Sequence, residues 1–243
     1  DQAQVLAVYS HGFNHIDVEA ATDMGIIVTN GAGMCAEEVS NQAVTMALAL
    51  NRQIVQTTNQ LRHTGDWDRT TFLPIQAIDE QTLGIVGFGN IGRQVARKLG
   101  QGWRMETLVY DPYIEPWIIG EYGVEQVFEL NELCKRADYI IVVVPLNTET
   151  FHMIGEEQFD HMKETAYFIN VCRGSVTDET ALINALNQGK IRGAGLDVFE
   201  QEPVDPANPL LQMENVITAP HLAGASTRSA WLASQRASQQ VAA

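Results

Sequence analysis

The sequence predicts an α/β fold, a doubly wound parallel sheet accompanied by part of a second lobe, and three observations support this. At 243 residues the chain is long enough to bury a large core, in one big domain or two smaller ones. From residue 82 onward, short apolar runs typical of strands alternate with stretches of helical period. One strand–helix pair is joined by a glycine-rich turn. Such alternation implies parallel strands with helices on both faces of the sheet.

Composition and charge exclude several classes of protein. Hydrophobic residues make up 45% of the chain and charged residues 19%, as in ordinary globular proteins. The formal net charge of −15 argues against nucleic acid or an anionic membrane as a partner. No apolar run approaches the roughly 20 residues that a membrane-spanning helix needs. The three cysteines, Cys35, Cys134 and Cys172, match neither a disulfide framework nor a zinc site, so we expect a cytoplasmic protein without a metal.

The N-terminal part predicts only a fragment of a domain. Strands over 5–9 and 26–28 flank a short helix, and this single βαβ unit is too small to be stable alone. Asp1 stands in place of a starting methionine, so we expect the true N-terminus to be missing from this sequence.

A long helical pattern runs from residue 36 to about residue 61. Its apolar residues recur at helical spacing: Val39, Ala43, Met46, Ala47, Leu50 and Ile54. The helix is long enough to bridge two lobes, although an ordinary buried helix would give the same pattern. The irregular segment 63–78 that follows carries Trp67 and Phe72, which suggests a contact surface.

The remaining elements follow in order along the chain. We predict strands over 82–87, 106–110, 124–127, 138–144, 165–170, 192–197 and 215–218. Helices are predicted between them, near 91–100, 129–136, 155–162 and 178–188. Right-handed crossovers in the strand order 3-2-1-4-5-6 would give one sheet, in a domain that spans residues 36–221.

The glycine-rich turn predicts a dinucleotide-binding site. The strand over 82–87 ends in Gly-x-Gly-x-x-Gly, and a helical pattern begins at once. Gly87 permits the tight turn, Gly89 lets a pyrophosphate approach the backbone, and Gly92 lets the helix pack closely on the strand. The phosphates would lie at the helix N-terminus, where unpaired N–H groups favour negative charge. A glycine-rich turn in an ordinary α/β protein is the structural alternative.

The next strand supplies the carboxylate that such a site needs. The strand over 106–110 is followed by Asp111, 19 positions after Gly92. This is close to the spacing of about 20 expected for the acid that binds the adenosine ribose. Because a carboxylate at this position repels a 2′-phosphate, the sequence favours NAD over NADP as the cofactor.

Charged side chains follow three later strands of the predicted sheet. Arg173, Asp197 and His221 each come at or just after the end of a strand, and Glu200 and Glu202 come shortly after Asp197. Ligands of open α/β sheets bind outside the carboxyl ends of the strands. We therefore expect these side chains to gather at one edge of the sheet, beside the glycine-rich turn.

Four motifs together resemble those of the D-isomer-specific 2-hydroxyacid dehydrogenases. They are the glycine turn with Asp111, Asn-x-x-Arg-Gly at 170–174, Gly-Ala-Gly-Leu-Asp-Val-Phe-Glu-x-Glu-Pro at 193–203, and Pro-His-Leu-Ala-Gly at 220–224. The resemblance covers nearly the whole chain. It implies a Rossmann NAD-binding domain, the remnant of a flavodoxin-like substrate lobe in residues 1–35, a helix starting within 222–243 that returns to this lobe, and a homodimer.

The resemblance implies three catalytic residues, Arg173, Glu202 and His221. The planar donors of Arg173 would hold the carboxylate and carbonyl groups of a 2-oxo acid. His221, as an imidazolium, would protonate the carbonyl oxygen while hydride adds to the carbon, and would take the proton back in the reverse direction. Glu202 would orient the imidazole and favour its charged form. The implied function is NAD-dependent hydride transfer between a small 2-hydroxy acid and its 2-oxo acid, with D stereospecificity.

The glycine motif and the resemblance also predict the binding residues. Those expected to bind the cofactor are Gly87, Gly89, Asn90, Ile91, Gly92, Asp111, Val144, Pro145, Val171, Cys172, Arg173, Asp197, His221 and Gly224. The turn formed by Ser10, His11 and Gly12 resembles the family's loop whose backbone N–H groups bind the substrate carboxylate, together with Arg173.

Several alternatives stay open. Glu200 is interpreted as solvated, and the remaining histidines are interpreted as structural or exposed: His11, His15, His63, His152 and His161. Asn14 and the segment 39–42 depart from the family pattern, which leaves the identity of the substrate open. The alternative function is a non-enzymatic, NAD(H)-sensing interaction protein on the same fold, like the corepressor relatives of the family.

Overall fold

The structure, a computed structural model, describes residues 3–10, 12, 13 and 15–242. The described chain divides into two compact units, Asp1–Val39 with Gly224–Ala243, and Ser40–Ala223. The domain boundaries expected from the sequence, after residues 35 and 221, stay a prediction about the intact protein. Each unit is considered by itself below.

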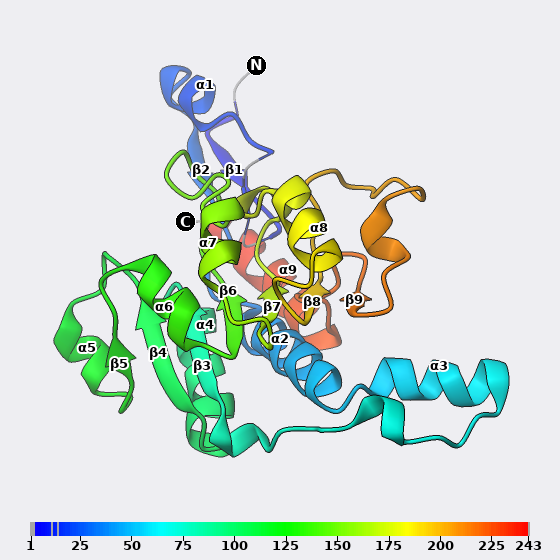
Figure 1. Ribbon diagram of the computed structural model, residues 1–243. Coiled ribbons are helices and arrows are strands. Elements are labelled where there is room, and N and C mark those ends of the chain that lie inside the picture. Colours follow the sequence, from blue (N-terminus) through cyan, green and yellow to red (C-terminus); the bar gives the residue numbers. More distant parts are fainter. Residues whose placement is uncertain (1–2, 11, 14, 243) are drawn as a thin grey trace. The chain divides into compact units, whose positions relative to one another are not determined.

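The larger unit is built on a parallel sheet. In chain order its strands are β3 (Thr82–Val86), β4 (Glu106–Tyr110), β5 (Glu125–Gln126), β6 (Tyr139–Val142), β7 (Tyr167–Asn170), β8 (Gly193–Leu196) and β9 (Val216–Thr218). Within the described residues they lie in the order β5-β4-β3-β6-β7-β8-β9, and every neighbouring pair is parallel (Figure 1). The doubly wound sheet and the predicted order 3-2-1-4-5-6 are confirmed, and β9 extends the sheet.

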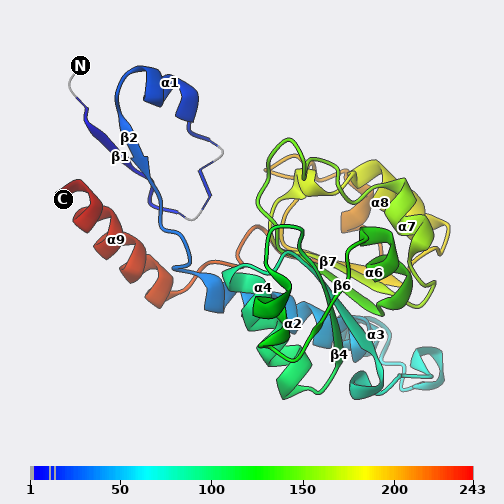
Figure 2. The ribbon, with the colours of Figure 1, turned by 90° about the vertical axis from the view of Figure 1, so that its left-hand side faces the viewer.

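Helices cover both faces of this sheet. In chain order, the helices from Ala36 to Asn187 are α2 (Ala36–Asn51), α3 (Ile54–Thr64), which extends away from the sheet, α4 (Asn90–Val95) with a π-helical continuation over Ala96–Gly102, α5 (Pro116–Gly120), α6 (Leu130–Arg136), α7 (Glu156–His161) and α8 (Glu179–Asn187). Helices α6, α7 and α8 pack in sequence against one another (Figures 1 and 2). Short 3₁₀ turns cover Thr70–Phe72, Ile78–Glu80, Gly174–Val176 and Pro209–Leu211.

Burial explains why the central strands are apolar along their whole length. Every residue of β6 and β7 is buried, as expected for strands covered on both faces. In β8, Ala194 and Leu196 join the core beneath α7 and α8. Gly195 points to the opposite face, where an added Cβ would come within 3.0 Å of Met46 Cβ in α2. The glycine therefore permits the close approach of helix α2 to the sheet.

The single helix predicted over residues 36–61 is wrong. The structure has two helices, α2 and α3, separated at Gln53, whose φ of +50° lies in the left-handed region. Gln53 Nε2 donates to the Phe72 carbonyl and Asn51 Nδ2 to the Gln76 carbonyl, so tertiary bonds hold the break. The helical period continues across the break in the sequence, which is why the pattern concealed it. Ile54, expected on the buried face, is 55% exposed.

The smaller unit holds the predicted βαβ arrangement. Strand β1 (Val5–Ala7) pairs in parallel with β2 (Ile27–Thr29), and α1 (Val18–Asp23) connects them. The C-terminal helix α9 (Thr227–Ala242) packs on β1. The hydroxyl of Tyr9, just after β1, donates to the carbonyl of Ala230 at 2.7 Å.

Within the part of the chain that the structure describes, we find no helix with the length and apolar character that crossing a membrane requires.

Candidate active site

The glycine turn after β3 has the shape that a dinucleotide requires. Gly87 has a φ of +98°, and a Cβ there would lie 2.8 Å from Val144 Cγ1. A Cβ on Gly92 would lie 2.2 Å from the Gly87 carbonyl oxygen. At Gly89, by contrast, no described atom lies within 4 Å of an added Cβ. The first and third glycines thus permit close packing, while the second faces open space. Such an open cradle fits a pyrophosphate.

The carboxylate of Asp111 lies against this turn. Its Oδ2 accepts the N–H of Phe88 at 2.7 Å, and its Oδ1 accepts the N–H of Tyr113 at 2.9 Å. An ionised carboxylate can accept about four hydrogen bonds, so these two bonds leave capacity for the hydroxyls of a ribose. Asn90 and Ile91 begin helix α4, and Val144 and Pro145 follow β6 at the same edge of the sheet.

Glu202 and His221 form a pair at the carboxyl edge of the sheet. The Nδ1 atom of His221 lies 2.7 Å from Glu202 Oε2, and the two side chains are 45% and 38% exposed. The other carboxylate oxygen of Glu202 accepts the N–H of Phe199 at 3.1 Å. With Nδ1 directed to the carboxylate, Nε2 is the ring nitrogen left for proton transfer. The structure therefore brings together these two side chains, which stand 19 residues apart in the chain.

Asp197 fixes the backbone of the loop that carries His221. Its side chain is fully buried, with Oδ1 accepting the N–H of Leu222 at 3.0 Å and Oδ2 that of Ala223 at 2.8 Å. Its carbonyl accepts the N–H of His221, which has a φ of +53°. Burial raises the pKa of Asp197, and the two N–H bonds oppose that effect. The structure thus shows Asp197 as an anchor of the histidine loop, a role that the sequence did not indicate. Its predicted contact with the cofactor stays a prediction.

Arg173 follows β7 and begins the next segment of the site. Its Nη1 donates to the Cys172 carbonyl at 2.5 Å. The turn is shaped by Asn170, whose amide donates to the Arg173 carbonyl at 2.9 Å and whose oxygen accepts the Cys172 N–H at 3.0 Å. Val171 and Cys172 are buried, and burial raises the pKa of the Cys172 thiol to about 11. This cysteine is therefore a buried neutral thiol at neutral pH.

Glu200 is exposed, as interpreted from the sequence, but its carboxylate also has partners within the protein. Its side chain is one-third exposed, and its Oε1 lies 2.7 Å from His152 Nε2. The same oxygen accepts the N–H of Glu179, the first residue of α8, at 3.0 Å. The reason is that the turn after β8 folds onto the N-terminus of α8, where a carboxylate finds unpaired N–H groups. Sequence spacing carried no signal for this contact.

Apart from Arg173, the predicted substrate residues belong to the smaller unit. Ser10 Oγ donates to the Gly12 carbonyl at 2.6 Å, which closes a tight turn. His11, between them, and Asn14 lie outside the described residues. Gly224 also belongs to this unit, where an added Cβ would lie 3.5 Å from Cys35 Sγ. The predicted roles of Ser10, His11, Gly12 and Gly224 stay predictions.

Comparison with known proteins identifies the family. Residues 44–223 match the family model described as D-isomer specific 2-hydroxyacid dehydrogenase, NAD binding domain. The chain belongs to the D-isomer-specific 2-hydroxyacid dehydrogenase family. It is 45% identical over 230 residues to a D-3-phosphoglycerate dehydrogenase of Methanocaldococcus jannaschii, covering 95% of this chain and 43% of the relative. It is 44% identical over 232 residues to a glyoxylate reductase of Korarchaeum cryptofilum, covering 93% and 69%. The chain thus spans less than half of the first relative's length.

Solved structures of 2-hydroxyacid dehydrogenases share the architecture. The holo form of Rhodotorula graminis D-mandelate dehydrogenase matches with a TM-score of 0.90 and 30% identity, over 97% of this chain and 70% of that one. D-Lactate dehydrogenase from Aquifex aeolicus, complexed with NAD and lactic acid, matches with a TM-score of 0.88 and 30% identity, over 97% and 74%. The predicted α/β fold and the predicted family are both confirmed.

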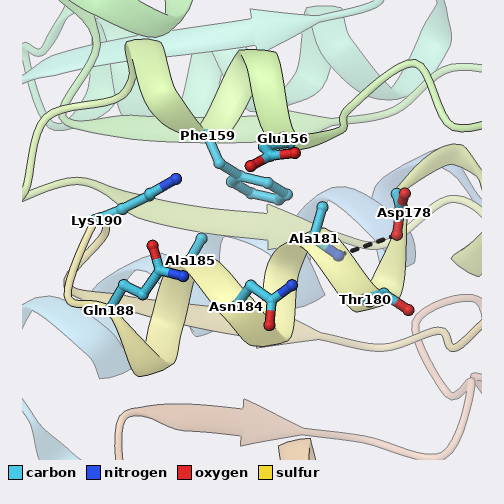
Figure 3. Close-up of a pocket in the computed structure, with 9 residues that line it drawn as sticks. All are labelled: Glu156, Phe159, Asp178, Thr180, Ala181, Asn184, Ala185, Gln188 and Lys190. Atoms are coloured by element: carbon cyan, nitrogen blue, oxygen red, sulfur yellow. Dashed lines mark hydrogen bonds between the residues drawn. The ribbon is translucent and has the colours of Figure 1, made fainter.

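Two cavities elsewhere in the described chain are lined by no predicted site residue or by only one. Figure 3 shows a cavity of about 140 Å³ between α7 and α8. The Phe159 ring extends from α7 toward α8, and Glu156, Asp178 and Lys190 also line the cavity. A hollow of about 340 Å³ in the smaller unit runs along β1 and includes Ser10. Among the described side chains, no group of three or more His, Cys, Asp or Glu residues is arranged to hold a metal ion.

Proposed function

We propose that this chain is the cofactor-binding and proton-transferring part of an NAD-dependent 2-hydroxyacid dehydrogenase with D stereospecificity. The observation that carries the proposal is the 2.7 Å pair of His221 and Glu202, at the edge of the sheet where the glycine turn opens. The substrate is a small 2-oxo acid in one direction and the corresponding 2-hydroxy acid in the other.

NAD is the cofactor, and when bound it supplies or accepts the hydride. The open cradle at Gly89 would hold the pyrophosphate, and the Asp111 carboxylate would accept hydrogen bonds from the adenosine ribose. The negative charge of Asp111 disfavours a 2′-phosphate, so we propose preference for NAD over NADP. The buried Val171, the half-buried Val144 and the exposed Pro145 complete the proposed cofactor surface.

The protein side chains handle the substrate oxygens and one proton. Arg173 presents fixed, planar donors to the carboxylate and carbonyl oxygen of the 2-oxo acid. The imidazolium of His221 donates the Nε2 proton to the carbonyl oxygen, while the Glu202 carboxylate compensates the positive charge and fixes the ring through Nδ1. In the oxidation direction neutral Nε2 accepts the hydroxyl proton. We extend the proposal to Ser10, His11 and Gly12 as donors to the substrate carboxylate.

A binding measurement and a turnover measurement test the proposal separately. Titration with NADH should quench or shift tryptophan emission, and Asp111→Ala should weaken NADH binding about tenfold while relaxing discrimination against NADPH. The intact protein should then oxidise NADH in the presence of one or more 2-oxo acids from a panel. If neither dinucleotide binds, the proposal is wrong. Binding without turnover across the panel would instead support the alternative that the sequence left open, a non-enzymatic NAD(H)-sensing protein. None of the observations above favours that alternative.

The proposal includes a homodimer in the cytoplasm. Figure 1 shows α3 and the segment after it extending away from the sheet, and this extension exposes Ile54, Trp67 and Leu73. Exposed apolar surface of this kind is typical of protein–protein contacts. Free thiols at Cys134 and Cys172 fit a reducing compartment.

A further inference from the structure

A second histidine–glutamate pair stands beside the proposed catalytic one. Glu200, two residues before Glu202, contacts His152 Nε2 through its Oε1 at 2.7 Å. The same oxygen accepts the Glu179 N–H at 3.0 Å, and in return Glu179 Oε2 accepts the Glu200 N–H at 3.1 Å. Glu179 Oε1 in turn accepts a bond from Asn208 Nδ2 at 2.6 Å. Glu200 is therefore held through both its side chain and its backbone.

These contacts join loops that follow three adjacent strands. His152 follows β6, Glu179 begins the helix that follows β7, and Glu200 follows β8. Because β6, β7 and β8 are parallel neighbours, their carboxyl ends lie side by side, and Glu200 is the residue that contacts the other two loops. The loop of His152 is fixed independently, since its N–H donates to the Ser175 carbonyl at 2.9 Å.

The loop of Arg173 and the loop of Glu202 also touch directly. A Cβ on Gly174 would lie 1.9 Å from the carbonyl carbon and oxygen of Phe199, so the two backbones are in contact there. Phe199 donates its N–H to Glu202 Oε1, and Glu202 Oε2 faces His221. The turn over 199–202 therefore makes three contacts in succession. Phe199 touches Gly174, Glu200 bonds to Glu179, and Glu202 bonds to the His221 imidazole.

We propose that Glu200 is a positioning residue for the reaction: its hydrogen bonds with Glu179 and its contact with His152 hold the turn over 199–202 so that Glu202 meets His221. The inference rests on the proposed function for its chemistry and on the contacts above for its geometry. Glu200 acts by fixing the backbone that presents Glu202, and not through a bond of its own to the His221 imidazole. Preorganised side chains of this kind orient catalytic groups before the ligand arrives.

The experiment reads the His221 ring directly, by NMR of the protein labelled with ¹⁵N-histidine, with His221→Gln used to assign the signal. Glu202→Gln defines the signal of an imidazole that has lost its carboxylate. We expect Glu200→Ala to move the His221 Nδ1 signal most of the way to that position. Glu200→Gln keeps an acceptor for the Glu179 N–H and a side chain of the same size beside His152, so it should leave the signal near that of the wild type. An unchanged signal in Glu200→Ala overturns the inference.

A matched control separates positioning from general stability. Glu125→Ala removes a carboxylate bonded to Arg136 at the far edge of the sheet, on β5, and should leave the His221 signal unchanged. A shift in that variant equal to the shift in Glu200→Ala also counts against the inference. If Glu200→Ala does not fold, His152→Ala removes one partner of Glu200 and must give a shift in the same direction; no shift there overturns the inference too.

The turnover measurement keeps the two proposals distinguishable. In the intact protein, Glu200→Ala should lower kcat about tenfold, with the Kd for NADH within about twofold of the wild type and with Glu200→Gln restoring most of kcat. Equal losses of kcat and NADH binding would mean a merely structural role. If the wild type shows no turnover with any 2-oxo acid, the proposed function fails, while the NMR result still decides whether Glu200 positions Glu202.

Discussion

At the scale of single residues, backbone N–H groups fix the carboxylates of the site. Asp197 accepts N–H groups of the histidine loop, Glu202 accepts that of Phe199, and Asp111 accepts that of Phe88. Hydrogen bonds to ionised groups are stronger than those between neutral groups, and they leave less freedom than contacts between long side chains. The positions of the acids are therefore set by the fold itself, before substrate or cofactor binds.

His221→Gln should separate proton transfer from cofactor binding. The amide cannot act as a general acid or base, so kcat of the intact protein should fall by about 10²–10⁴. The affinity for NADH should stay nearly constant, because Asp111 and the glycine turn hold the dinucleotide. Steady-state kinetics and a fluorescence titration measure the two quantities. Arg173→Ala is the companion variant and should weaken 2-oxo acid binding as well. Similar loss of NADH binding in both variants would show that the residues are structural.

Cys172 should be unreactive in the native protein despite its place beside Arg173. The thiolate is the reactive form, and burial raises the pKa of this thiol to about 11, so very little thiolate exists at pH 8. Iodoacetamide at pH 8 should leave Cys172 unmodified for as long as the protein is folded. In urea the same residue should react readily, as peptide mass spectrometry would show. Rapid modification of the native protein would contradict the assignment of Cys172 as a buried neutral thiol.

The single residues differ in how far sequence could predict them. Glu202 could be distinguished from Glu200 because only Glu202 precedes the motif's proline, and the structure pairs it with His221. The partners of Glu200 could not be found in this way. They lie 21 and 48 positions away, and a carboxylate on a loop carries no periodic pattern that indicates which helix terminus it will meet.

At the scale of elements, close approaches of backbone at glycines shape the edge of the sheet. Gly92 brings α4 against the end of β3, and Gly174 brings the loop after β7 against the loop after β8. Gly89 faces open space instead. Glycines of one motif thus serve different ends, since some allow packing within the protein and one leaves room for a ligand.

Alanine substitutions should distinguish these uses of glycine. Gly92→Ala places a Cβ 2.2 Å from the Gly87 carbonyl oxygen, so the free energy of unfolding should fall by about 1–3 kcal/mol. Gly89→Ala meets no described atom within 4 Å, so the protein should unfold at nearly the wild-type urea concentration but lose most NADH affinity. Urea unfolding and NADH titration of both variants check this. Strong destabilisation by Gly89→Ala, or unchanged NADH binding, would contradict it.

The elements show why the hydrophobic pattern of a sequence predicts strands better than it predicts short helices or the interruption of a helix. The strands β3, β4, β6 and β7 were predictable because apolar runs covered on both faces stand out between turn residues. Helix α5, with a proline at its start and few residues, falls below the length at which a helical period can be recognised. The break at Gln53 depends on bonds from Gln53 and Asn51 to a segment about twenty residues later, so local spacing could not reveal it.

At the scale of the whole molecule, α3 and residues 65–77, together called the arm, present apolar side chains that are exposed in the described structure. Helix α3 has no buried residue along its length in the described structure. Trp67 is 85% exposed and Leu73 is 55% exposed. Large apolar side chains that are this exposed are unfavourable in water unless another surface buries them. The symmetric self-association of most soluble oligomers makes a second copy of the chain the proposed occupant.

Aspartate substitutions in the arm should therefore separate the dimer into monomers. In Trp67→Asp with Leu73→Asp, a charge replaces each apolar contact, and burying it unpaired costs more than the contact contributes. Sedimentation velocity should give a dimer for the wild type and a monomer for the double variant at the same concentration. Trp117→Asp is the control, since Trp117 is 66% exposed on α5 and lies outside the arm, so this variant should stay dimeric. NADH should still bind the monomeric variant, because Asp111 and the glycine turn do not belong to the arm. A monomeric wild type, or a double variant that stays dimeric, would refute the role of the arm.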